Sequence, residues 1–333
     1  MGDRGAIFQP GANTACLHGG AMFFRALKYF LGLSLVFILP FITGCTGKEN
    51  PEKVDFEKRS ALDQGENHSD KILRVAIGSM ITPEEGFAYY KGILNYLEDK
   101  LDMHIKLMDR KNYTETNDLI KTGNADIAFV CTGAYVVVHD EAGAELLAMP
   151  QINGRAVYHS YIIAHKDSDI NNFTDLKGRS FAFVDPLSNT GKTFPTYLLI
   201  QLNETPDTFF SRYIYTNRHD KSIMAVAQGF VDGAAVDGLI WDYLDKTNPR
   251  YTSQTKIVLK SRPFASPPII ARKTLAPELK KNISGILTGM HNDEKGREIL
   301  KGMMIDRFVR ADDADFASAR NMIETVNEKK RAY

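Results

Sequence analysis

Two stretches of the chain follow the same pattern: GNADIAFV occupies residues 123–130, and GFVDGAAV occupies residues 229–236. They share glycine, aspartate, alanine and valine at the same offsets. In each, a helical pattern ends at the glycine, which is favoured just beyond a helix because it tolerates a left-handed backbone. An apolar strand follows, as expected for a sheet that helices cover on both faces. Loops between helices and strands often look alike, but the repeat favours two similar α/β lobes.

Strand and helix patterns alternate outward from these stretches, which is typical of parallel α/β sheets. We expect strands over residues 72–78, 104–108, 126–131, 180–185 and 213–215, and helices over residues 90–101, 114–121, 191–202 and 223–230. The C-terminal part, residues 277–326, is expected to be mostly helical and to pack against the lobes.

Two extended and largely apolar segments, residues 157–166 and 257–272, lie between the lobes. We therefore expect a two-lobed α/β fold in which each lobe is a mostly parallel sheet flanked by helices. The first lobe is expected to comprise residues 71–158 and 262–333, and the second lobe residues 159–261. Two crossings between the lobes indicate a hinge with a cleft beside it.

The composition is that of an ordinary folded protein. The chain has 333 residues, and its 41 Lys and Arg balance 41 Asp and Glu. This balance argues against a nucleic-acid-binding protein, which normally has a basic excess. A hydrophobic fraction of 44% excludes wholesale disorder, and three cysteines cannot form a disulfide framework. The length is sufficient for two domains.

The N-terminal part has the composition of an export signal. Arg25 and Lys28 precede an apolar run over residues 29–42, which is shorter than the roughly 20 residues of a membrane-spanning helix. Small residues then lead to Cys45. The true start of the chain is either Met1 or Met22.

Residues 42–45, Ile-Thr-Gly-Cys, resemble the lipobox of bacterial lipoproteins. This resemblance implies that residues 1–44 are removed and that Cys45 is lipidated, which would anchor the protein firmly to a membrane. An uncleaved anchor and a plain signal with an incidental cysteine are the alternatives. Residues 45–70 are polar and without periodicity, and we interpret them as a flexible tether.

The strongest candidate for a binding site is DPLSNTG at residues 185–191, between a buried strand and a helix. Ser188, Asn189 and Thr190 are favoured helix-capping residues, and Gly191 follows them. The first turn of a helix has unpaired N–H groups and a partial positive charge, so it can hold an oxyanion without a charged side chain. Open α/β sheets bind ligands at this edge. Ordinary capping, which needs only one of these residues, is the alternative interpretation.

Other candidates follow other strands. His219 and Ser222 lie in NRHDKS at residues 217–222, although Asp220 alone could cap that helix. Tyr135 follows the third strand and could either belong to the core or point its phenol into the cleft. Ser79 occupies a similar position after the first strand.

Enzyme signatures are missing from the sequence. It contains no His-Glu-x-x-His, no Gly-x-Ser-x-Gly, no Walker phosphate loop and no dinucleotide fingerprint, and its eight histidines lack metal-ligand spacing. We therefore expect neither a metal nor a cofactor, and no catalytic residue. A secreted phosphoester hydrolase with Ser188 as nucleophile and His219 as base is the least favoured alternative.

Several motifs occur in order along the chain: RVAIG at residues 74–78, YLE at 96–98, GxxDIA at 123–128, DPxSxTG at 185–191, HxxSIxAV at 219–226 and VDGA at 231–234. With them, residues 73–326 resemble the phosphate, phosphite and phosphonate substrate-binding proteins of bacterial ABC importers. The resemblance implies a type II periplasmic binding fold whose lobes close on a ligand. It also implies that Ser188, Asn189 and Thr190 hold the phosphonate group, with His219 and Tyr135 in the cleft.

The chain departs from the family pattern in two places. Asn189 stands where a hydroxyl residue is usual, although its amide can still donate. Members that hold an aminoalkylphosphonate use acidic groups for the amine, whereas residues 265–268 here are Ala-Ser-Pro-Pro. This favours phosphate, phosphite or a small phosphonate with an uncharged tail. Asp237 or Asp242 could still supply a carboxylate from elsewhere.

The sequence thus predicts a lipid-anchored, monomeric solute-binding protein on the periplasmic side of a bacterial membrane, either inner or outer. Its expected partners are a small phosphorus oxyanion and an ABC permease, and no nucleic acid. A sensor of the same fold, coupled to a membrane signalling protein, is the main alternative.

Overall fold

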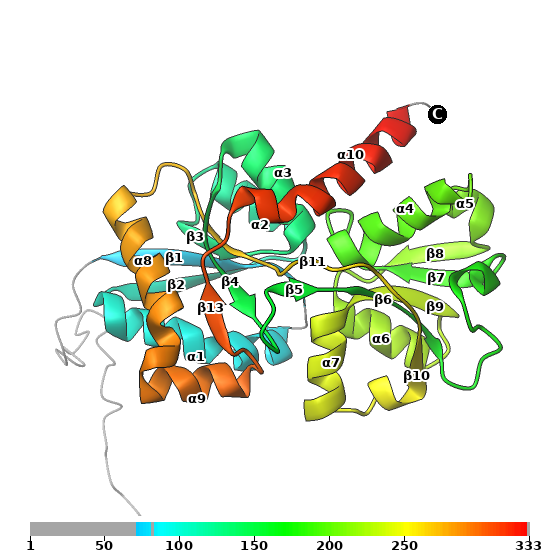
Figure 1. Cartoon of the computed structure of the whole chain (residues 1–333), viewed down its shortest axis with the longest axis horizontal. Helices are drawn as coiled ribbons and strands as arrows, with labels where there is room; N and C mark the ends of the chain where they lie inside the picture. Colours follow the sequence, from blue (N-terminus) through cyan, green and yellow to red (C-terminus); the bar gives the residue numbers. More distant parts are fainter. Residues whose placement is uncertain (1–70, 81–82, 332–333) are drawn as a thin grey trace, which may run out of the picture. The chain divides into compact units, whose positions relative to one another are not determined.

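The computed structural model describes residues 71–80 and 83–331 and shows two α/β sheets joined by two short strands (Figure 1). The expected signal region, the tether and Cys45 lie outside these residues. The first sheet has the strand order β13-β4-β12-β3-β1-β2. Its strands are β1 (Ile72–Ile77), β2 (His104–Asp109), β3 (Ile127–Phe129), β4 (Glu145–Gln151), β12 (Ile269–Ala271) and β13 (Arg307–Val309).

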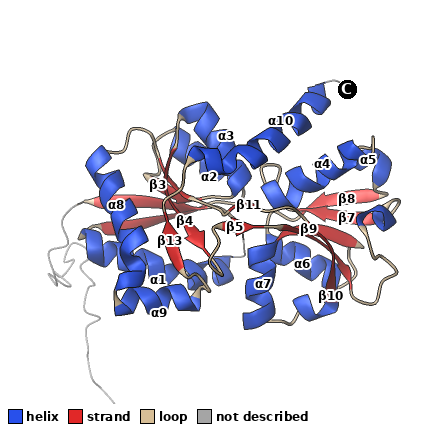
Figure 2. Ribbon diagram, in the orientation of Figure 1, coloured by secondary structure: helices blue, strands red, loops and turns tan. Residues whose placement is uncertain are grey.

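Helices flank this sheet, as the coloured ribbon in Figure 2 shows. They are α1 (Pro83–Leu101), α2 (Tyr113–Lys121), α3 (Thr132–Ala142), α8 (Pro277–Gly289) and α9 (Glu294–Gly302), with short 3₁₀ turns at Met290–Asn292 and Asp313–Phe316. Helix α10 (Ala317–Arg331) ends the described chain. It packs against α3 of the first lobe and also against α4 (Phe194–Gln201) of the second.

The second sheet has the strand order β10-β6-β9-β7-β8. Its strands are β6 (Ser160–His165), β7 (Ser180–Phe183), β8 (Arg212–Tyr215), β9 (Gly233–Asp237) and β10 (Thr255–Lys260). Its remaining helices are η1 (Phe173–Leu176), η2 (Asn189–Thr193), α5 (Pro206–Phe209), α6 (His219–Ala227), α7 (Gly238–Thr247) and η3 (Thr252–Gln254). The short strands β5 (Val157–Tyr158) and β11 (Phe264–Ala265) pair with each other where the chain passes between the sheets.

The repeated sequence pattern has a structural counterpart in its two aspartates. The Asp126 carboxylate accepts the backbone N–H of Arg74, at 2.9 Å, and the Asp232 carboxylate accepts that of Ser180, at 2.8 Å. In both lobes the aspartate, just before its own strand, thus binds the backbone of the residue level with it on the neighbouring parallel strand. In the first lobe, Arg74 and Arg272 also form ion pairs with Asp126. The shared aspartate therefore joins adjacent strands at the same point of each sheet.

The sheets are less parallel than the sequence predicts. Strands β1, β2 and β3 run parallel, as do β7, β8 and β9, but β4, β12 and β13 pair antiparallel, and so do β6 with β9 and β10 with β6. The reason lies in the crossings. Strands β6 and β12 follow the two crossings, so they start beside the other lobe and run away from it. The parallel strands run toward it. The expected helical C-terminal part also contains β13, which extends the first sheet.

The core is continuous from lobe to lobe along the crossings. Side chains with almost no exposed surface include Leu73, Ile127 and Ile270 in the first lobe and Phe181 and Phe183 in the second. In the second lobe, Phe181 stacks on Phe210 with ring centroids 4.4 Å apart. Such packing makes each lobe rigid enough to position helix starts accurately at its edge.

Candidate functional site

In the described part of the chain, helices α2, α3, η2, α6 and α7 each begin shortly after the carboxyl end of a strand. The first turn of each helix has N–H groups without a helical partner and a partial positive charge. Helices α2 and α3 belong to the first lobe, and the other three belong to the second. Hydrogen bonds between the lobes show that these starts lie close together.

Three such contacts join residues at the helix starts. The backbone N–H of His219 donates to the carbonyl of Met80, at 2.8 Å, and that of Tyr113 donates to Asp185 Oδ2, at 3.0 Å. The backbone N–H of Asn189 points at Cys131 Sγ, at 3.5 Å. In each pair one residue comes from the first lobe and the other from the second. The predicted segment at residues 185–191 therefore lies between the lobes and not on an outer surface.

The turn at residues 188–191 caps its helix and also leaves buried polar atoms unpaired. Ser188 Oγ accepts the N–H of Gly191, at 3.0 Å, so Ser188 does cap the helix. Gly191 is required because a Cβ there would lie 2.5 Å from Val184 Cγ2. By contrast, Thr190 Oγ1 and Asn189 Oδ1 are buried and have no hydrogen-bond partner. Since buried polar groups are nearly always paired, the Thr190 hydroxyl is the best candidate to donate to an oxyanion, whereas Asn189 Oδ1 can only accept from a protonated oxygen of a ligand.

His219 is a neutral hydrogen-bond donor in this arrangement. Its Nδ1 accepts the backbone N–H of Asp237, at 2.9 Å, so the proton of the neutral ring is on Nε2. Nε2 lies 3.4 Å from the Tyr113 hydroxyl, which belongs to the first lobe. Burial lowers the pKa of His219 to about 3, so the ring stays uncharged at neutral pH. An anion between the lobes would thus meet an N–H group without the cost of burying a cation.

Two carboxyl groups lie at the same place. Burial raises the pKa of Asp237 to about 7, although its Oδ1 also accepts the N–H of Leu239, at 2.8 Å. Burial also raises the pKa of Asp185, whose carboxylate accepts the N–H groups of Tyr113 and Leu187. A protonated carboxyl can donate to an oxyanion, whereas an ionised one would repel it. Ionisation of Asp237 would therefore disfavour an anion at this place.

The other predicted residues lie elsewhere. Ser222 Oγ is paired with Thr216 Oγ1, at 2.7 Å, inside the second lobe. Ser79 is next to Met80, but its hydroxyl is bound to the carbonyl of Arg110. The Tyr135 hydroxyl donates to Asp313 Oδ1, at 2.8 Å, so the structure pairs this phenol with the 3₁₀ turn that precedes α10.

Two tyrosines that the sequence analysis did not select occupy the position expected for Tyr135. Tyr113 faces His219, and the Tyr158 hydroxyl accepts from Asn189 Nδ2, at 3.2 Å. Both are fully buried, and burial raises the pKa of each phenol well above its ordinary value. Tyr113 begins a helix after strand β2, but β2 is not a buried strand and the cap of this helix is Asn112, so the signal that identified Ser188 did not point to Tyr113. Tyr158 lies on β5, in the first crossing between the lobes, and no local sequence pattern indicates its contact with Asn189.

The geometry does not place His219 as a general base for Ser188, as the hydrolase hypothesis requires. Ser188 Oγ is engaged by Gly191, and the His219 ring faces Asp237 and Tyr113. A ring with a pKa of about 3 is also a poor proton acceptor at neutral pH.

Residues 71–80 and 83–331 contain no group of three His, Cys, Asp or Glu side chains arranged for a metal. Within the same ranges, every helix is too short or too polar to cross a bilayer.

Two open α/β sheets joined by paired crossings, with polar helix starts buried between them, define the class of type II periplasmic binding proteins. Residues 75–316 match the family described as "ABC transporter, phosphonate, periplasmic substrate-binding protein". The chain belongs to this family.

Characterised relatives are distant. The phosphate-import protein of Mycolicibacterium smegmatis is 29% identical over 204 residues, which are 58% of this chain and 63% of that protein. The phosphonates-binding periplasmic protein of Escherichia coli is 26% identical over 219 residues, 64% of each chain. The match thus spans slightly less than two thirds of either relative.

Solved structures support the fold. A binding protein component of an ABC phosphonate transporter from Pseudomonas aeruginosa superposes with a TM-score of 0.75 at 22% identity, covering 79% of this chain and 89% of that one. PhnD1 from Prochlorococcus marinus, solved in complex with methylphosphonate, has a TM-score of 0.71 at 18% identity, covering 77% and 98%.

Proposed function

We propose that this protein is an extracytoplasmic solute-binding lipoprotein that captures a phosphorus oxyanion between its lobes and delivers it to an ABC importer. The candidate ligands are phosphate, phosphite and small phosphonates. Family membership supports the class of function, and the named ligands of the relatives support the class of ligand. Cys45 is the proposed site of lipid attachment on the periplasmic side of the membrane.

The observation that carries the proposal is the set of neutral donors contributed by both lobes. Thr190 and His219 come from the second lobe, in the first turns of η2 and α6, and Tyr113 comes from the first lobe, where it begins α2. A ligand that contacts donors of both lobes binds the closed form better than the open one. Such differential affinity shifts the equilibrium toward closure without making or breaking a bond.

Thr190→Val tests the site with little risk to the fold. The Thr190 hydroxyl has no partner in the protein, so valine, which has the same shape, removes no internal hydrogen bond. We expect the unliganded protein to keep its thermal stability. Loss of a hydrogen bond to a charged ligand should weaken binding by about 1.5–3 kcal/mol, or roughly 10- to 150-fold.

Isothermal titration calorimetry with phosphate, phosphite, methylphosphonate and sulfate measures this effect. Thr247→Val is the matched control, since Thr247 is exposed on α7 and its hydroxyl binds only a carbonyl of its own helix. If Thr190→Val and Thr247→Val bind the same ligand equally well, Thr190 does not belong to the site. If no phosphorus oxyanion binds the unsubstituted protein, the proposed function is wrong.

A further inference from the structure

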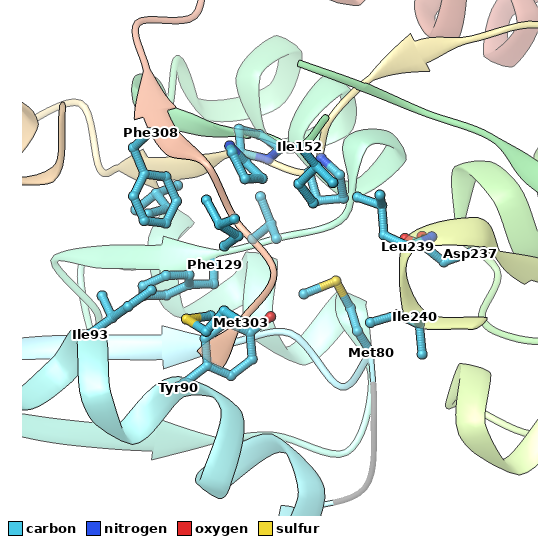
Figure 3. Close-up of a pocket in the computed structure, with 16 residues that line it drawn as sticks. Met80, Tyr90, Ile93, Phe129, Ile152, Asp237, Leu239, Ile240, Met303 and Phe308 are labelled. Carbon is cyan, nitrogen blue, oxygen red and sulfur yellow. The ribbon is translucent and has the colours of Figure 1, made fainter. Parts of the chain in front are cut away.

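A small apolar cavity of about 60 Å³ lies between the lobes (Figure 3). Met80 and Phe129 line it from the first lobe, Leu239 and Ile240 line it from the second, and Met303 also borders it. Figure 3 shows these side chains around one space, with Asp237 at the edge nearest α7. Asp237 supplies the carboxyl group of an otherwise almost wholly apolar lining.

The cavity adjoins the proposed oxyanion site through His219. The His219 N–H binds the carbonyl of Met80, and its ring nitrogen Nδ1 binds the N–H of Asp237. Both of these residues line the cavity. Asp237 is also aligned with Ser160 across β6 and β9, and Ser160 Oγ donates to the carbonyl of Thr190, at 2.8 Å. An oxyanion bound by Thr190 and His219 would therefore have the cavity beside it.

The second crossing makes the cavity apolar at the backbone as well. Pro267 and Pro268 line it and have no N–H group to offer. The carbonyl of Pro268 already accepts the N–H of Val130, at 3.1 Å. These prolines belong to residues 265–268, Ala-Ser-Pro-Pro, where members that bind an aminoalkylphosphonate are expected to have acidic groups. The cavity thus offers a ligand mainly carbon atoms to contact.

Building on the proposed function, we propose that this cavity receives a short unbranched alkyl tail, so that the preferred ligand is an alkylphosphonate with about two or three carbons. The volume equals about two water-sized groups of about 30 Å³ each. An ammonium group in the same place would have three donors to satisfy, and the lining offers it a single carboxyl group, that of Asp237, one oxygen of which already accepts the N–H of Leu239. Leaving those donors unpaired in an apolar cavity is costly. An alkyl tail has no such requirement.

Calorimetric titration with a homologous series tests the proposal. The probes are phosphite, methyl-, ethyl- and propylphosphonate, and 2-aminoethylphosphonate, which has the shape of propylphosphonate with an ammonium in place of the terminal methyl group. We expect affinity to rise about fourfold per methylene from methyl to propyl. We also expect 2-aminoethylphosphonate to bind at least tenfold more weakly than propylphosphonate.

The possible results separate this inference from the proposed function. If methyl- and propylphosphonate bind equally, or if the aminoethyl compound binds more tightly than the propyl one, the cavity does not hold an alkyl tail, although the oxyanion site stands. If none of the probes binds, the proposed function itself fails, and this inference fails with it.

Leu239→Phe provides a second measurement on the same series. Leu239 lies in the first turn of α7, is only partly buried and packs against the core from its edge, so a larger ring there should extend into the cavity. We expect the ratio of propyl- to methylphosphonate affinity to fall at least fivefold. Leu202→Phe is the control, because Leu202 is exposed and lies outside the cavity lining, and it should leave the ratio unchanged. An unchanged ratio in Leu239→Phe would overturn the assignment.

Discussion

Gly133→Ala is expected to hinder closure of the lobes. Gly133 lies in the first turn of α3, and a Cβ there would lie 2.4 Å from the carbonyl oxygen of Leu187 and 3.0 Å from the backbone nitrogen of Asn189. Both atoms belong to the backbone of the opposite lobe, so neither can rotate away. Ordinary contact begins at 3.4 Å. The lobes would therefore have to separate by roughly 1 Å at this point, by the difference of these two distances.

The magnitude follows from two opposing effects. Overpacking of a well-packed contact costs about 1–3 kcal/mol, which applies only to the closed form. Alanine in place of glycine in a helix stabilises the first lobe by up to about 1 kcal/mol in every form. We therefore expect methylphosphonate affinity to fall about 5- to 150-fold, while the melting temperature of the unliganded protein stays the same or rises by a few degrees.

Calorimetry for affinity and scanning calorimetry for stability measure the two effects separately. Gly285→Ala is the matched control: Gly285 lies within α8, and a Cβ there meets no atom within 4 Å. Its melting temperature should rise and its affinity should stay constant. The reasoning is refuted if Gly133→Ala binds the ligand as tightly as Gly285→Ala does, because the lobes would then not meet at Gly133 in the bound state.

Two further predictions concern buried groups between the lobes. Because burial raises the pKa of Asp237 from 3.8 to about 7, folding is favoured by its neutral form, and that contribution is complete below pH 3.8 and is lost as the pH rises through 7. Asp237→Asn, which retains the cap, should therefore gain stability relative to the unsubstituted protein as the pH rises from 5 to 8, by about 3 kcal/mol in urea unfolding; a constant difference would contradict this. Cys131 is a buried free thiol beside Asn189, and burial raises its pKa to about 11, so saturating methylphosphonate should slow its alkylation at least tenfold, as read from the mass of the Cys131 peptide. Equal alkylation rates with and without a ligand that binds would mean that binding does not close the lobes over this thiol.

The sequence determined the local elements because those depend on hydrophobic spacing and capping chemistry. The repeated Gly and Asp predicted two similar α/β units, and the structure shows why: Asp126 and Asp232 each bind a backbone N–H of the neighbouring parallel strand. The helix start at Ser188 was also visible in the sequence, since consecutive capping residues after a buried strand are a local signal.

Only the tertiary structure decided which helix starts meet. Tyr113 and Tyr158, not Tyr135, contact His219 and Asn189, because partners across a hinge are far apart in sequence and carry no shared local pattern. The tertiary structure likewise decided that β6 and β12, the strands after the two crossings, run antiparallel to their neighbours β9 and β3, because each starts beside the other lobe. The apolar cavity is assembled from both lobes, so no single segment of sequence encodes it.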